Sequence, residues 1–263
     1  MHMNIKEFFG FGGYSRTAEG YLSWQHLSFV SSLCLLMTVC AVILGRKNRS
    51  KSLEERNRCL VIAAILIDSF EILKILILSL RSKDPLHFTH ELPLFLCSIQ
   101  LITIPLAAFS KGRIKEAALD FVTIFGLLGA LAGTYFAGNN YGTYPVLCVD
   151  NVISGITHCI SGFCSLYILI SRMASMKKEN IPITLVILCF FCIGAYVANI
   201  FVDCNYMFLS RGDGTPYDIL FQLVKGHPLF YPLGVVALFV LYIYGYYTVY
   251  YRITKRSKES CAA

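Results

Sequence analysis

Cys97 and His158 carry side chains suited to nucleophilic catalysis. A cysteine thiolate attacks acyl carbons readily, and a neighbouring imidazole can take the thiol proton. Cys97 lies six residues past Glu91, and His158 lies eight residues past Asp150, each inside a long apolar run. If both runs are helices entered from the same side of a membrane, the two side chains lie about 9 Å and about 12 Å deep. This matched depth permits a Cys–His pair; the alternative is a buried thiol and an unrelated, hydrogen-bonded histidine.

Ionisable residues also interrupt another apolar run. Asp68, Glu71 and Lys74 follow one another at steps of three, so they share one face of a helix. Such groups are costly inside a membrane and commonly mark functional sites. Glu71 and Lys74 either form a structural ion pair or orient a polar substrate or the histidine. Together with polar residues near the same ends of other runs, they make up the predicted substrate-binding set: His26, Glu71, Lys74, Asn199, Asn205 and Tyr206.

The composition indicates where these residues act. The chain has 263 residues, of which 56% are hydrophobic and 15% are charged, and the mean hydropathy is +0.61. Soluble domains average about 25% charged residues. The composition therefore disfavours a soluble enzyme, a disulfide-rich extracellular scaffold and a disordered chain, and it predicts an integral membrane protein.

Seven apolar runs are long enough to cross a bilayer as helices. Sixteen Lys and Arg lie in segments 46–58, 111–116, 171–182 and 252–263, against six in the alternate segments. Because positive charge collects in cytoplasmic loops, this bias predicts an outside N-terminus and an inside C-terminus. We therefore predict an all-α fold, a single seven-helix transmembrane domain over residues 1–263. The predicted spans are Tyr21–Gly45, Cys59–Leu80, Leu92–Ser110, Ala117–Gly138, Val146–Ile170, Ile183–Asp203 and Leu229–Ile253.

The sequence predicts neither a metal nor a soluble cofactor. His87 and His90 do not form a helical metal motif, and Cys189 and Cys192 are a single CxxC pair. The net charge of +7 invites a nucleic-acid interpretation, but the loop bias of membrane proteins accounts for it. We expect membrane phospholipids or lysophospholipids as partners and no nucleic acid, and the oligomeric state is left open.

Four motifs of the chain are characteristic: Leu92-Pro93-Leu94-Phe95-Leu96-Cys97-Ser98, the most specific, with Tyr21–His26, Glu71–Lys74 and Asn205–Leu209. With them the chain resembles, over nearly its whole length, the YwaF-type bacterial integral membrane proteins, which are related to the transmembrane-protein-164 acyltransferase family. The resemblance implies a seven-helix protein of the bacterial cytoplasmic membrane that transfers acyl chains between phospholipids, with Cys97 as nucleophile and His158 as its base. Phe95 departs from the family pattern, which often has a histidine two residues before the cysteine.

Two functions are consistent with these features. The first is a membrane-embedded acyltransferase that moves an acyl chain between phospholipid and lysophospholipid through a Cys97 thioester in the outer half of the membrane. The second is a non-catalytic lipid- or solute-binding or transport protein, in which the thiol is incidental and a pathway is lined by Asp68, Glu71, Lys74 and Asn199. The predicted inner half has few polar groups apart from Asp120, which favours a one-sided pocket.

Overall fold

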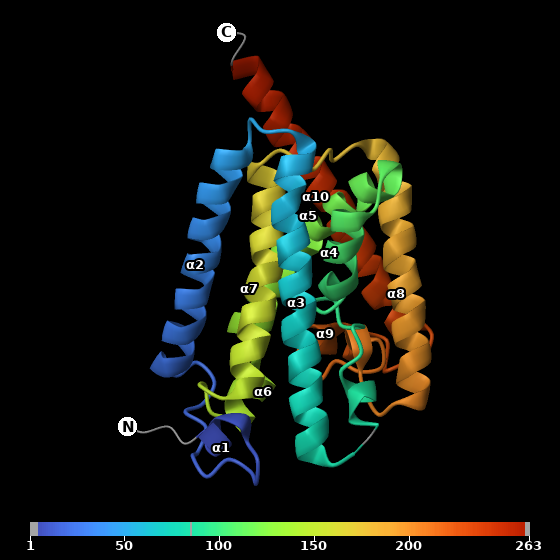
Figure 1. Ribbon diagram of the computed structural model, residues 1–263. Helices are drawn as coiled ribbons and strands as arrows, with labels where there is room; N and C mark the ends of the chain where they lie inside the picture. Colours follow the sequence, from blue (N-terminus) through green and yellow to red (C-terminus); the bar gives the residue numbers. More distant parts are fainter. Residues whose placement is uncertain (1–4, 85, 261–263) are drawn as a thin grey trace. The chain divides into compact units, whose positions relative to one another are not determined.

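The computed structural model describes residues 5–84 and 86–260, and these residues form helices and connecting segments without a strand. The predicted all-α class is confirmed. The chain divides into an N-terminal unit that ends at Ala174 and a C-terminal unit that begins at Ser175, and each is described by itself. The N-terminal unit contains α1 (Ile5–Phe9), α2 (Trp24–Asn48), α3 (Leu53–Ser82), η1 (His87–His90), α4 (Gln100–Phe109), α5 (Gly112–Tyr135), α6 (Gly138–Thr143) and α7 (Val149–Ile170) (Figure 1). The C-terminal unit contains η2 (Lys178–Asn180), α8 (Ile181–Phe201), η3 (Tyr206–Phe208), α9 (Tyr217–Leu223) and α10 (Phe230–Ser260).

Five segments of the described chain are long and apolar enough to cross a membrane: Trp24–Asn48, Gly112–Thr143, Val149–Ile170, Lys178–Phe201 and Phe230–Ile253. The chain is therefore a multi-pass membrane protein. Two of the seven predicted spans fall outside this set. The first is α3, which is 30 residues long but has the charges of Asp68, Glu71 and Lys74 in its middle. The second is the run 92–110, which is helical only from Gln100 to Phe109.

The structure corrects the depth that the sequence predicts for Cys97. That prediction assumes a helix that starts near Leu92, whereas residues 92–99 form turns ahead of α4. Pro93 cannot donate a backbone hydrogen bond. The Phe95 N–H donates to the Ser98 hydroxyl at 3.0 Å, instead of to a backbone carbonyl oxygen as it would in a helix. Cys97 therefore sits on a turn, where the rise of a helix does not apply.

Helix α5 is buried along most of its length and packs closely against α7. A Cβ added at Gly126 would lie 2.8 Å from the Ser161 carbonyl oxygen, so only glycine fits there. Nearby, the Ser165 hydroxyl donates to the Thr123 carbonyl oxygen at 2.8 Å. Small residues and hydroxyl bonds of this kind join helices in an apolar medium. In Figure 1, α2 runs along the other side of α7.

Polar bonds at both ends of the N-terminal unit fix its helices. At one end, Arg81 of α3 forms a two-point ion pair with Asp150 of α7, at 2.8 and 2.6 Å, and also donates to the Tyr14 hydroxyl. Burial and the hydrogen bond to Asp150 raise the pKa of Tyr14 well above its usual value. At the other end, the Lys115 ammonium donates to the Ala107 carbonyl oxygen at 2.7 Å and to Asn57 of α3 at 2.7 Å. These bonds hold the last turn of α4 against α3 and α5.

Candidate functional site

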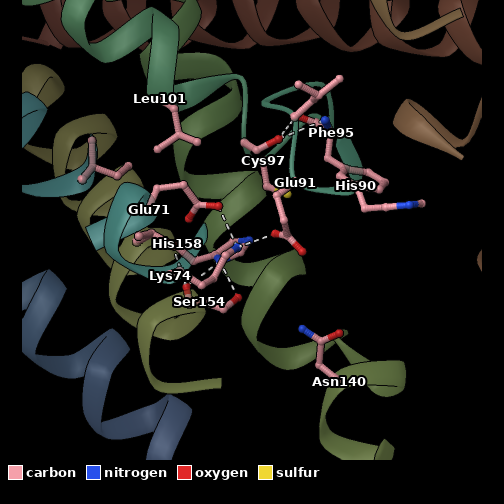
Figure 2. Close-up of a pocket in the computed structure, with 14 residues that line it drawn as sticks. Glu71, Lys74, His90, Glu91, Phe95, Cys97, Leu101, Asn140, Ser154 and His158 are labelled. Atoms are coloured by element: carbon pink, nitrogen blue, oxygen red, sulfur yellow. Dashed lines mark hydrogen bonds and ion pairs between the residues drawn. The ribbon is translucent and has the colours of Figure 1, made fainter. Parts of the chain in front are cut away.

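A cavity of about 250 Å³ lies within the N-terminal unit, beside the middle of α3 and the first half of α7. Its walls come from α3, from the segment between α3 and α4, from α4, from α6 and from α7 (Figure 2). Polar side chains predominate among its lining residues. They are Glu71, Lys74, His90, Glu91, Cys97, Ser98, Asn140, Ser154, Thr157 and His158, together with apolar Ile67, Leu92, Phe95 and Leu101.

Cys97 and His158 meet in this cavity. The half-buried Cys97 thiol faces the imidazole of His158, close enough for the two side chains to interact electrostatically. Ring nitrogen Nδ1 of His158 lies 2.7 Å from the Ser154 carbonyl oxygen, which can only accept, so Nδ1 carries the proton. Nε2 is buried and has no hydrogen bond of ordinary geometry to a described residue. The imidazole therefore presents a bare acceptor nitrogen in the cavity that contains the thiol.

Two glycines of α5 create the space that the pair occupies. A Cβ added at Gly129 would lie 3.3 Å from the Cys97 Cα, which is a tight contact. A Cβ added at Gly133 would lie only 1.9 Å from His158 Nε2. The glycine spacing of α5 therefore matters for the site, and not only for helix packing.

An ion-pair cluster forms one wall of the cavity. The Lys74 ammonium lies 2.7 Å from a Glu71 carboxylate oxygen and 3.0 Å from a Glu91 carboxylate oxygen. The ion pair with Glu71 is one of the two alternatives that the sequence leaves open for these residues. Glu71 and Lys74 belong to α3, whereas Glu91 follows η1 in the segment that leads to Cys97 (Figure 2). Two carboxylates and one ammonium leave this cluster with a net charge of −1. Lys74 is also close enough to act electrostatically on His158.

The predicted site residue His26 lies outside the lining of this cavity. Its ring is fully buried, and Nδ1 accepts the Leu22 N–H at 3.2 Å, so Nε2 carries the proton. Nε2 then donates to the Thr134 carbonyl oxygen at 3.0 Å. The ring also packs on Tyr141, with centroids 3.9 Å apart. His26 therefore joins the start of α2 to the end of α5 through these hydrogen bonds.

The remaining predicted residues belong to the C-terminal unit. The Asn199 side-chain amide donates to the Tyr206 carbonyl oxygen at 3.1 Å and accepts the Tyr206 N–H at 2.7 Å. Asn205 bonds the Arg211 carbonyl oxygen, the Asp213 carboxylate and the Ser210 N–H. These amides hold the turn after α8, where Met207 and Phe208 have left-handed φ values of 54° and 56°.

Sequence reasoning missed several residues of the cavity. Ser154 stands four residues before His158 in α7, a helical spacing that could have indicated their contact. Glu91 lies in the connection between η1 and α4, and Asn140 lies in the six-residue helix α6, so neither belongs to a segment long enough to show a periodic signal. Among the described residues, no group of three or more His, Cys, Asp or Glu could hold a metal ion.

Comparison with known proteins places the chain in a family. No curated protein and no solved structure gives a significant match. A family model for the TMEM164 family matches residues 21–250, a stretch that includes every wall of the cavity. The chain therefore belongs to the TMEM164 family.

Proposed function

We propose that this membrane protein transfers acyl chains between a phospholipid and a lysophospholipid through a thioester on Cys97. The observation that carries the proposal is the pairing of the Cys97 thiol with an imidazole whose Nδ1 is fixed by Ser154 and whose Nε2 has no other partner among the described residues. A nucleophile with an adjacent oriented base is the arrangement that acyl transfer requires. The resemblance of the motif around Cys97 to acyltransferases points the same way.

The proposed reaction has two steps. In the first, Nε2 of His158 takes the thiol proton while Cys97 Sγ attacks the ester carbonyl carbon of the donor lipid. The ester C–O bond breaks, the leaving lysolipid alkoxide takes the proton from Nε2, and a thioester forms. In the second, the acceptor hydroxyl gives its proton to Nε2 and attacks the thioester carbon. The C–S bond breaks, the proton returns to the thiolate, and the acylated lipid leaves.

In this proposal the ion-pair cluster orients the polar part of the lipid. Glu71, Lys74 and Glu91 line the same cavity as the reacting pair, so a glycerol or headgroup oxygen can bond Lys74 while the ester approaches Cys97. The apolar lining residues Phe95 and Leu101 would contact the acyl chain. Favourable contacts with these parts of the lipid, away from the reacting ester, position the ester for attack.

The proposal also includes the membrane topology. With the N-terminus outside the cytoplasmic membrane and seven crossings, the cavity with Cys97 opens toward the outer leaflet. The distribution of Lys and Arg supports this orientation.

Trapping the thioester tests the proposal. Purified protein is incubated with a defined phospholipid, quenched in acid and measured by intact mass spectrometry. We expect wild type to gain the mass of one acyl chain, removable by hydroxylamine, and Cys97→Ser to gain none. His158→Asn should slow adduct formation by about 10²–10⁴-fold, which is the usual contribution of general base catalysis.

The matched control is Cys189→Ser, which removes an exposed thiol of α8. It should acquire the acyl mass as wild type does. An adduct that persists in Cys97→Ser would contradict the assignment of the nucleophile. Absence of both the adduct and any product lipid in wild type would contradict the proposed function itself.

A further inference from the structure

A second cavity of the N-terminal unit, of about 310 Å³, lies between the last turn of α2 and the last turn of α7. It is at the opposite end of α7 from Ser154, and it shares no lining residue with the cavity that contains Cys97. Three arginines and three apolar side chains line it: Arg46, Arg49, Arg172, Val42, Leu169 and Ile170.

The cavity carries a concentrated positive charge. Its lining has three guanidinium groups and no carboxylate. Within the described residues, none of the three guanidinium groups is engaged in an ion pair. Guanidinium groups bind phosphate oxygens through two parallel hydrogen bonds, which makes arginine the usual residue for phosphate recognition.

The backbone around these arginines is held in place. Arg56 of α3 donates from Nη1 to the carbonyl oxygens of Ser171 and Arg172, at 2.8 and 3.1 Å. The Tyr167 hydroxyl in turn donates to the Arg56 carbonyl oxygen at 2.8 Å. These bonds fix Arg172 in a left-handed conformation with φ of 58°.

A glycine brings the two helices of this cavity together. A Cβ added at Gly45 would lie 2.8 Å from the Ile170 Cβ, so α2 and α7 approach closely there. Arg46 thus lies in the last turn of α2, and Arg49 and Arg172 lie directly after the ends of two closely packed helices.

If α2 and α7 cross the membrane, the arginines at their ends lie where phospholipid headgroups are expected. Both α2 and α7 are apolar helices long enough to cross a membrane, and the arginines stand at their ends. Basic pockets between transmembrane helices at this level bind anionic headgroups. On the membrane side of the arginines, Val42, Leu169 and Ile170 offer the apolar surface that an acyl chain needs. A free phosphate ion would use the arginines and leave this apolar surface without a role.

We propose that the cavity lined by Arg46, Arg49 and Arg172 is a binding site for an anionic phospholipid. The three guanidinium groups hold the lipid phosphate, and the part of the acyl chain nearest the headgroup lies over Val42, Leu169 and Ile170. The site is separate from the Cys97 cavity and does not depend on acyl transfer.

Phosphatidylglycerol binding to the full-length protein in neutral detergent, measured by native mass spectrometry, tests the proposal. Phosphatidylcholine and inorganic phosphate serve as comparison probes. We expect wild type to bind phosphatidylglycerol at least tenfold more tightly than phosphatidylcholine. In the triple variant Arg46→Gln, Arg49→Gln, Arg172→Gln the affinity for phosphatidylglycerol should fall at least tenfold. The conservative variant Arg46→Lys, Arg49→Lys keeps the charge but loses the two-point hydrogen bonding of guanidinium. Its affinity for phosphatidylglycerol should fall by about threefold or more.

The control removes the same number of charges beside the cavity. Lys47, Lys51 and Arg58 lie at the same end of the unit but do not line it. The variant Lys47→Gln, Lys51→Gln, Arg58→Gln should bind phosphatidylglycerol within threefold of wild type. Equal losses in the two triple variants would overturn the proposal, because general surface charge would then explain binding. Displacement of phosphatidylglycerol by millimolar inorganic phosphate would overturn it as well, in favour of a free-anion site.

Thermal unfolding in detergent shows whether each variant is as stable as wild type. If the arginine triple variant unfolds well below wild type, the Arg-to-Lys variant decides the outcome, because it preserves charge and side-chain length. Wild-type binding by that variant would then contradict the proposal. Thioester formation on Cys97 should be unchanged in it, which separates this proposal from the proposed function.

Discussion

At the scale of residues, the feature that defines the site is a histidine with one ring nitrogen fixed and the other bare. Ser154 holds Nδ1 of His158, and the absence of a side chain at Gly133 leaves room for Nε2. His26 shows the contrast, because both of its ring nitrogens are bonded to the backbone of Leu22 and Thr134. The two histidines therefore differ in chemical availability, and of the two only His158 can accept a proton without breaking a bond.

The space beside His158 gives a prediction. Gly133→Ala would place a methyl group 1.9 Å from Nε2, so His158 must rotate away from Cys97. Overpacking of this kind costs about 1–3 kcal/mol, and misplacing a catalytic group by about 1 Å can slow a reaction about 10²-fold. We expect the rate of acyl-adduct formation to fall by that order, measured by rapid acid quench and mass spectrometry.

The matched control is Gly245→Ala, a glycine inside α10 with nothing within 4 Å of an added Cβ. It should leave the rate of adduct formation unchanged and should not lower the melting temperature. A Gly133→Ala protein with a wild-type rate would show that His158 does not need its observed position.

At the scale of elements, the segment between α3 and α4 needs an external anchor. It contains η1 and the turns that carry Cys97, and it has no regular helix after His90 until Gln100. The bond from Lys74 to Glu91 ties this segment to α3 at 3.0 Å, and the packing of Gly129 against the Cys97 Cα ties it to α5. Contacts with neighbouring helices therefore fix the position of Cys97 more than its own local structure does.

Charge reversal tests the anchor. Lys74→Glu would set a carboxylate against Glu71 and Glu91, and leaving charged groups without their partner costs more than the about 1–3 kcal/mol of an unpaired neutral group. We expect the segment to detach, with a changed rate of Cys97 alkylation by a small maleimide and a loss of adduct formation. Adding Glu91→Lys should restore both, because the ammonium group introduced at position 91 can bond the carboxylates at positions 71 and 74.

The control for this pair is Glu91→Lys alone, which places two ammonium groups side by side and should resemble Lys74→Glu. If the double variant behaves no better than either single variant, the Lys74–Glu91 bond is not what positions Cys97. Melting temperatures of all three variants distinguish loss of the anchor from global unfolding.

At the scale of the whole molecule, the chain separates into two helical units, and the cavity with Cys97 and the cavity with the three arginines both lie within the first. Helix α7 contributes to both, with Ser154 and His158 in its first half and Leu169 and Ile170 at its end. If α7 crosses the membrane, the two cavities face opposite leaflets. The orientation of α7 then decides which leaflet supplies the reacting lipid.

Topology reporters test that orientation. Because Lys and Arg are concentrated in segments 46–58, 111–116 and 171–182, we expect a fluorescent protein fused to the C-terminus to fold inside the cell and fluoresce. Alkaline phosphatase fused after Gly142 should be active, since residues 139–145 are predicted to lie outside. The opposite pattern, a dark C-terminal fusion with inactive phosphatase, would reverse the predicted topology and put the Cys97 cavity in the inner half of the membrane.

Sequence reasoning predicted several of the long helices closely. The predicted spans at Tyr21–Gly45, Val146–Ile170 and Ile183–Asp203 match α2, α7 and α8 closely, because long apolar runs form helices wherever lipid surrounds them. The run around Cys97 was predicted as helix because its composition is apolar, and composition does not report the Pro93 and Ser98 interactions that prevent it.

The sequence alone determined that this is an all-helical, multi-pass membrane protein, since apolar length and composition follow from the order of residues without reference to distant contacts. It also placed Glu71 and Lys74 on one helix face, where the observed ion pair is one of the two roles it left open, because their separation of three residues is local. Only the tertiary structure decided that Cys97, His158 and Glu91 share a cavity with that pair, while His26 lies outside its lining and Asn199 and Asn205 are bonded within the other unit. Which side chains meet depends on the rotation of each helix about its own axis and on close approach at glycines such as Gly133. The hydrophobic pattern predicts neither.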